Sequence, residues 1–148
     1  SSKTNSNPGA AIDADVTTAF NITYVNTSDA PPATAPDWFQ VDLGSTQSFN
    51  QIVLDTRKAA SSFPRDLKVY VSNSTTFGSP VATITNNAMG VVRVSFSTQS
   101  ARYIRVEASR FGKDWGVNRN VNPLPTYVSW NIADFQVYAP GTYVAPTV

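Results

Sequence analysis

The chain has 148 residues, of which 11 are Lys or Arg and 10 are Asp or Glu, so its net charge at pH 7 is +1. This length is sufficient for one domain with its own core, and the charge gives no strong attraction for nucleic acid or an anionic membrane. The chain has no Cys and no His, which excludes disulfides, thiolate catalysis and the commonest zinc ligands. No apolar run approaches the ~20 residues of a membrane span. We therefore expect no nucleic-acid and no membrane partner.

Ser, Thr and Asn supply most of the polarity of the chain, which favours a secreted protein. The first residues, SSKTNSNPG, contain no apolar signal-peptide segment, so we expect a mature or excised piece of a longer protein. Residues 1–140 are predicted to form one module. Residues 141–148, which include Pro and Thr, are predicted to begin a linker.

Short segments in which apolar and polar residues alternate predict strands throughout the chain. In chain order these segments are 38–43, 51–54, 67–72, 80–84, 91–96, 102–107 and 133–138. We expect 80–84 to be an edge strand, because it begins with Pro. Roughly seven or eight short strands with turn residues between them indicate an all-β fold, an antiparallel sandwich.

Three connections are longer than the usual ~4–6 residues, namely 21–37, 57–64 and 112–130. The longest of them, 112–130, is the strongest candidate for a functional loop. Its aromatic residues Trp115, Tyr127 and Trp130, together with Tyr24, are suited to stacking on the apolar faces of sugar rings. The alternative is that such rings close the ends of the sandwich.

Two carboxylates and a hydroxyl occur close together near the start of the chain, at Asp13, Asp15 and Thr18. A hard cation such as Ca²⁺ binds six to eight oxygens, many of them backbone carbonyls. The alternative interpretation is that the Asp side chains cap their own turns. Elsewhere no pair of carboxylates is marked as a catalytic acid and base, so we expect a protein that is not an enzyme.

Five motifs, in order, resemble those of the discoidin, or coagulation-factor C-type, superfamily. They are AIDAD followed by Thr18, WFQVDLG at 38–44, DLKVYVS at 66–72, ARYIRV at 101–106 and IADFQVY at 132–138. The match covers about residues 8 to 140 and is most similar to carbohydrate-binding module family 32 and the N-terminal domain of galactose oxidase. The resemblance implies a galactose-binding-like jelly-roll β-sandwich of two antiparallel sheets.

The resemblance also implies a structural Ca²⁺ that ties the two ends of the module together. By position its ligands are the Ala10 carbonyl, the Asp13 carboxylate, the Asp15 carbonyl, the Thr18 carbonyl and hydroxyl, the Ala133 carbonyl and the Asp134 carboxylate. Ala14 stands where the family usually has Gly, and Asp134 where it usually has Glu.

For a sugar site, the resemblance points to loops at one end of the sandwich. The matching residues are Asn21, Tyr24, Arg57 and Trp130, and Trp115 and Tyr127 lie in the adjoining loop. Asn21 replaces a His that is common in galactose-binding members. A glucan or chitosan is therefore as plausible a ligand as a galactose-type glycan.

The expected function is that of a non-catalytic carbohydrate-binding module. It would bind an oligo- or polysaccharide as a monomer and target an attached, secreted glycoside hydrolase to that polymer. The alternative is a discoidin-type domain that binds a protein or lipid surface. The loops carry no apolar spike backed by Lys or Arg, which favours the carbohydrate.

Overall fold

The computed structural model describes residues 3–5, 8–25, 36–56, 63–114 and 127–144. Its elements are β1 (Lys3–Asn5), the 3₁₀ helix η1 (Pro8–Ala11), β2 (Phe20–Val25), β3 (Asp37–Asp55), β4 (Pro64–Ser72), β5 (Ala82–Ile84), β6 (Val91–Asp114), β7 (Tyr127–Ile132), β8 (Asp134–Ala139) and β9 (Thr142–Val144). Every strand pairing within these residues is antiparallel. The predicted all-β class is therefore confirmed.

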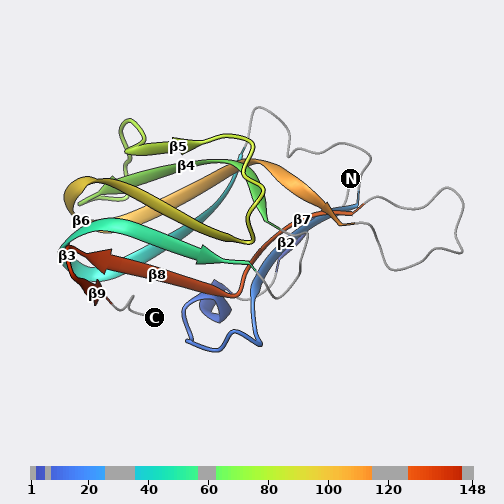
Figure 1. Ribbon diagram of the computed structural model, residues 1–148, viewed down its shortest axis with the longest axis horizontal. Helices are drawn as coiled ribbons and strands as arrows, with labels where there is room; N and C mark the ends of the chain where they lie inside the picture. Colours follow the sequence, from blue (N-terminus) through green and yellow to red (C-terminus); the bar gives the residue numbers. More distant parts are fainter. Residues whose placement is uncertain (1–2, 6–7, 26–35, 57–62, 115–126, 145–148) are drawn as a thin grey trace, which may run out of the picture.

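The long strand β6 organises the sandwich (Figure 1). It pairs with β3 on one side and β4 on the other, and this sheet continues through β5 at one edge and through β8 and β9 at the other. The end of β6 pairs with β7, which pairs with β2, and β2 with β1. Two antiparallel sheets thus share one strand.

The core follows from alternation along the strands. In β3, Phe39 and Val41 are buried, whereas Trp38 is 52% exposed. Ile52 and Leu54, further along the same strand, are also buried. Successive side chains of a strand point to opposite faces, so one face of each sheet supplies the core and the other meets solvent.

Two strands are longer than the sequence predicted. β3 joins the predicted segments 38–43 and 51–54, and β6 joins 91–96 and 102–107. Their pairing shifts register between Asp42 and Gln47 and again between Phe49 and Gln51. Such irregularities bend a strand without ending it. The alternation of apolar and polar residues is therefore interrupted between the two predicted segments, although the strand continues through them.

Other strands lie where we predicted connections. β2 occupies 20–25, overlapping the start of the expected connection 21–37, and β7 occupies 127–132, overlapping the end of the expected connection 112–130. β9 pairs with β8 through residues 142–144, so the sheet includes residues that we expected to begin a linker. Within the described residues no helix is long and apolar enough to cross a membrane.

Candidate functional site

The strand ends that flank two of the long connections meet at one end of the molecule. Val25, the last residue of β2, pairs with Tyr127, the first residue of β7. Tyr127 also pairs with Asp114, the last residue of β6. In Figure 1 these three ends lie together on the right. The segments 26–35 and 115–126 therefore leave from the same place.

The starts of β3 and β4 lie beside the same part of β6. Asp37 pairs with Ala108, and Pro64 pairs with Phe111. The connections that precede these strands therefore also reach this end, which we call the loop end: the strand termini Val25, Asp37, Pro64, Asp114 and Tyr127. Arg57 belongs to the connection that precedes β4 and Trp115 to the one that precedes β7, and both lie outside the described residues.

A buried hydroxyl anchors the chain directly before Arg57. Thr56 is fully buried, and both its backbone N–H and its Oγ1 donate to the Gly90 carbonyl, at 2.8 and 2.7 Å. A buried hydroxyl without a partner would cost free energy. The bonds of the Thr56 N–H and hydroxyl to the Gly90 carbonyl therefore hold Thr56 in this position. Thr56 thus fixes where the connection to β4 begins.

An ion pair braces the start of β4 against β6 near the loop end. Nη2 of Arg110 donates to Oδ1 of Asp66, and its Nε lies 2.8 Å from Oδ2. The hydrogen bond from Arg110 lowers the pKa of Asp66 below its usual value, with help from the Asn86 N–H. Asp66 therefore serves as a structural partner of Arg110.

The predicted stacking role of Trp130 is contradicted by its position. Its side chain is fully buried and packs against the rings of Phe20 and Phe111, with centroids 6.3 and 6.0 Å away. A ring with no exposed face has no surface for a sugar. β7 directs Trp130 inward with Ile132, so the ring belongs to the core.

The other predicted sugar contacts are distributed along the strands near the loop end. Tyr24 lies in β2 one residue before its end, and Tyr127 begins β7. Asn21 lies near the start of β2, where it pairs with Asn131 inside the sheet. Asn21 is therefore further from the loop end than the resemblance implied.

The predicted calcium loop gathers its oxygens around one hydroxyl. Oγ1 of Thr18 lies 2.8 Å from Oδ2 of Asp13, 3.0 Å from the Asp15 carbonyl and 3.3 Å from the Ala10 carbonyl. These are four of the donors that the resemblance named. They come from four residues of the loop, and the arrangement suits a hard cation.

The turn in this loop is the one that glycine favours. Ala14 has a φ of +60°, a left-handed conformation that costs an L residue roughly 1–2 kcal/mol. The Asp15 N–H donates to Oδ1 of Asp13 at 2.9 Å, which holds the turn closed. The loop thus keeps its shape although Ala replaces Gly.

The C-terminal half of the predicted calcium set makes hydrogen bonds to β3 and within β8. Oδ2 of Asp134 accepts a hydrogen bond from Nε2 of Gln136 at 2.6 Å, and the Ala133 N–H donates to the Asp55 carbonyl. In the described part of the chain, no three acidic side chains lie close enough to hold a metal ion. η1 contacts β8, which brings the two halves into the same region.

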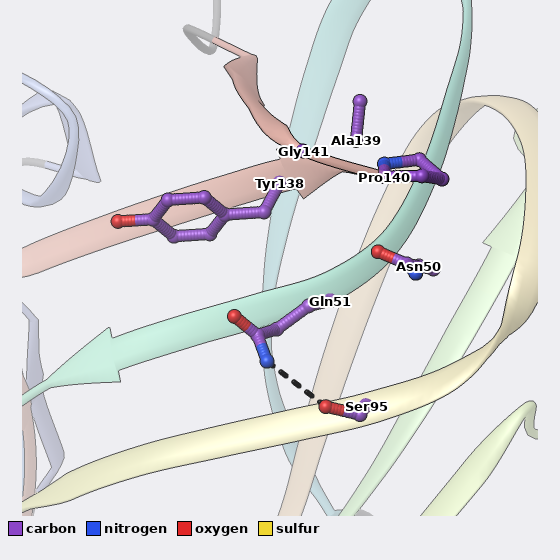
Figure 2. A pocket seen from close by; sticks show the side chains of 7 residues that line it. All are labelled: Asn50, Gln51, Ser95, Tyr138, Ala139, Pro140 and Gly141. Atoms are coloured by element: carbon purple, nitrogen blue, oxygen red, sulfur yellow. Dashed lines mark hydrogen bonds between the residues drawn. The ribbon is translucent and has the colours of Figure 1, made fainter.

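A hollow that sequence reasoning missed lies on the outer face of the sheet (Figure 2). It has a volume of about 320 Å³ and is lined by Asn50, Gln51, Ser95, Tyr138 and the turn 139–141. The only sequence signal was the polar positions of three predicted strands, which alternation assigns to solvent. Their convergence depends on the register of β6, β3 and β8, which no local pattern reveals.

Next to it is a larger hollow of about 630 Å³ on the same face. Val53, Arg93 and Gln136 line it, with Asn87 and Met89 from the connection between β5 and β6. Gln51, Val53 and Asp55 alternate along β3 with the core residues Ile52 and Leu54. Both hollows therefore follow one strand.

The arginines of β6 form local pairs. Arg102 makes two bonds to the Asp42 carboxylate, at 2.7 and 2.8 Å. This bond and the Gly44 N–H lower the pKa of Asp42 to about 2. Arg105 lies between the rings of Trp38 and Phe77, 4.7 and 4.3 Å from their centroids.

The comparison with family models gives a match over residues 10–106, more than half of the chain, to the NedA-like, galactose-binding domain, a coagulation-factor C-type family. The chain belongs to this family. Its membership confirms the resemblance to discoidin domains that the five motifs indicated. A comparison with curated proteins found no match.

Several solved structures share the fold of this galactose-binding domain. Chitosan-binding module 1 of a chitosanase/glucanase from Paenibacillus sp. IK-5 has a TM-score of 0.63 and 23% identity, covering 93% of this chain and 94% of that one. Module 2 of that enzyme, in complex with chitotriose, has a TM-score of 0.62 and 19% identity, covering 93% of this chain and 95% of that one. The family 32 module from C. perfringens NanJ, in complex with galactose, has a TM-score of 0.60 and 22% identity, covering 92% of this chain and 90% of that one. The jelly-roll sandwich is confirmed.

Proposed function

We propose that this galactose-binding domain is a non-catalytic carbohydrate-binding module whose binding surface is the loop end. The observation that carries the proposal is the meeting of Val25, Asp114 and Tyr127 in one pairing register. This register joins the two longest connections to one place, on a scaffold whose family is named for galactose binding. The solved structures with galactose and chitotriose support a saccharide ligand.

We assign Arg57, Trp115, Tyr24 and Tyr127 to the ligand. A guanidinium donates to sugar hydroxyls, and aromatic rings stack on the apolar faces of the sugar. Trp130 is not part of this set, because it is buried. Its burial supports the site indirectly, since it holds β7 against β2 and β6 where the connections begin.

The same proposal includes a structural Ca²⁺ in the loop that precedes β2. The Asp13 carboxylate, the Thr18 hydroxyl and the Ala10 and Asp15 carbonyls would hold the ion, and Ala133 and Asp134 would complete its ligands. The hub of oxygens at Thr18 supports this assignment. When bound, the ion would link the start of the chain to β8 and add its binding energy to folding.

We further propose that the module is secreted and attached to a glycoside hydrolase. Its polar composition with few charges supports secretion, and the module from the Paenibacillus chitosanase/glucanase shows the same fold in such a context. The module would then keep the catalytic domain near its polymer through an increased effective concentration.

A glycan array tests the function directly. The labelled protein is expected to bind glucan, chitosan or galactose-type oligosaccharides, and phosphatidylserine vesicles in a parallel flotation assay are expected to remain unbound. Binding to the vesicles and to no glycan would instead support a lipid-binding discoidin domain.

A further inference from the structure

Three strands place polar side chains on the outer face of the sheet, on either side of Val53, which is apolar and buried. Gln51 of β3 pairs with Ser95 of β6 and Tyr138 of β8, and two residues further along β3, Val53 pairs with Arg93 and Gln136. Both rows face away from the core, because Ile52 between them is buried in it. The two hollows lie over these rows.

We propose that this face is a second binding site, for a neutral saccharide chain, separate from the loop end. We call it the sheet-face groove: the two hollows over the rows of Gln51 and Val53. The proposal extends the proposed function, because it assigns a second surface to the same class of ligand.

The chemistry of the smaller hollow favours a neutral, hydroxyl-rich ligand. Its polar side chains are Asn50, Gln51, Ser95 and Tyr138, and its seven lining residues include no Lys, Arg, Asp or Glu. Amide and hydroxyl groups each both donate and accept hydrogen bonds, as sugar hydroxyls do. A phosphate or a carboxylate would find no cation in this hollow to balance its charge.

The polar groups are already held in position. Nε2 of Gln51 donates to Oγ of Ser95 at 2.9 Å, as Figure 2 shows. The hydroxyl of Tyr138 donates to Oε1 of Gln136 at 2.6 Å. Groups that are fixed before binding lose less conformational freedom when a ligand arrives. The amide of Gln51 uses one donor hydrogen in this bond and has a second.

Two rings give the smaller hollow apolar surfaces beside its polar groups. Tyr138 contributes a partly buried phenol ring, and Pro140 an exposed pyrrolidine ring from the turn between β8 and β9. Gly141 has a φ of +86° and completes this turn. Sugar rings combine apolar C–H faces with hydroxyl edges, and a site of flat rings with a few polar groups suits them.

The length of the groove favours a chain over a single sugar. Gln136 accepts the bond from Tyr138 of the smaller hollow and itself lines the larger one, so the two hollows share a polar link. From Gln51 to Asp55 the strand advances about 14 Å, at ~3.4 Å per residue. This span exceeds one hexose ring, so two or more units would lie along it.

The smaller hollow and the loop end are on different parts of the molecule, whereas the larger hollow borders the loop end, because Asn87 in its lining donates to the Pro64 carbonyl. In Figure 1 the end of β8 and β9 lie on the left, whereas β2, β7 and the end of β6 lie on the right. A substitution in the smaller hollow is therefore expected to leave the loop end unchanged.

The test uses backbone amide signals of the full 148-residue chain during titration with cellotetraose, laminaritetraose and galactotetraose. Signals of residues 50–51, 95, 138–139 and 141 are expected to shift with at least one of these sugars. Gln51→Lys places a long cation in the smaller hollow and is expected to weaken binding at this face at least tenfold. Gln47→Lys is the matched control, because Gln47 also donates to a Ser hydroxyl at 2.9 Å but lies outside the hollow.

The outcomes separate the two proposals. Shifts confined to residues around Val25, Asp114 and Tyr127 would overturn the second site and leave the proposed function standing. An absence of shifts with all three sugars would overturn the second site, and the chitosan oligosaccharides of the glycan array would then decide the proposed function separately. If the Gln51→Lys and Gln47→Lys variants bound the tetrasaccharide at the groove with equal affinity, the second site would also be overturned.

Discussion

The indole of Trp130 packs against the ring of Phe111 with centroids 6.0 Å apart, and none of its surface is exposed. We predict that Trp130→Ala destabilises the fold by about 3–5 kcal/mol, because it leaves a cavity in the core. Urea unfolding followed by circular dichroism measures this loss. Trp38→Ala is the control, since Trp38 is 52% exposed, and it is expected to cost less. Equal costs for the two variants would contradict the core role of Trp130.

Calcium is predicted to stabilise the domain through the loop around Thr18. At a free Ca²⁺ concentration of 100 times Kd, the free energy of unfolding would increase by about 2.7 kcal/mol, which raises Tm by roughly 5–10 °C. Thermal unfolding in Ca²⁺ and in EGTA measures the difference.

The matched variants for calcium are Thr18→Val and Thr17→Val. Thr18 contacts the Asp13 carboxylate and two carbonyls, whereas Oγ1 of Thr17 donates to Oδ1 of Asp15 at 2.6 Å. Thr18→Val is expected to remove most of the response to Ca²⁺, and Thr17→Val to keep it. The same Tm in Ca²⁺ and EGTA for the parent protein would refute the ion site.

The bond between Asp42 and Arg102 is predicted to make stability depend on acid. The pKa of Asp42 is lowered from 3.8 to about 2, chiefly by the hydrogen bond from Arg102. Because the unfolded chain takes up this proton at a higher pH, the stabilisation is present above about pH 4 and is lost as the pH falls through about 2. Asp42→Asn is expected to show a weaker loss of urea midpoint over this range. Identical pH profiles for the two proteins would contradict the prediction. Asp66, whose pKa is also lowered, preserves part of the acid dependence in the variant.

Thr56 is predicted to stabilise the start of the connection that carries Arg57. Thr56→Val removes the hydroxyl that donates to the Gly90 carbonyl and is expected to cost about 1 kcal/mol. Thr56→Ser keeps the hydroxyl and is expected to retain most of the stability in urea unfolding. If Thr56→Ser lost more stability than Thr56→Val, the methyl group of Thr56 and not its hydroxyl would be responsible for the effect.

Much of the fold could be predicted because alternation marks strands with one buried face. The pattern at 38–43 and 91–96 appears in the burial of Phe39, Val41, Val92 and Val94. β7 was missed although residues 128–132 alternate apolar and polar side chains, because most of them were assigned to the long connection 112–130. Trp130, Asn131 and Ile132 are buried in succession, so both faces of this part of the strand are covered, which only tertiary packing determines.

The candidate sites were predicted unevenly for similar reasons. The calcium loop is local in sequence, so Asp13 and Thr18 could be predicted as neighbours, and the structure places them 2.8 Å apart. The sheet-face groove unites Gln51, Ser95 and Tyr138 through strand register, which no short motif encodes. Trp130 was misassigned because a residue beside a long connection has the same local sequence whether its strand turns it inward or outward.

Calorimetric titration of the domain and its Arg57→Ala variant with glucan, chitosan and galactose-type oligosaccharides tests carbohydrate binding at the loop end most directly. The domain is predicted to bind at least one of them with a Kd in the micromolar to millimolar range, about −8 to −4 kcal/mol. Arg57→Ala is predicted to bind at least tenfold more weakly at an unchanged Tm, and Lys58→Ala, its cationic neighbour, to bind as the parent does. A folded protein that releases no binding heat with any of these oligosaccharides, or an Arg57→Ala variant with the affinity of the parent, would contradict this account.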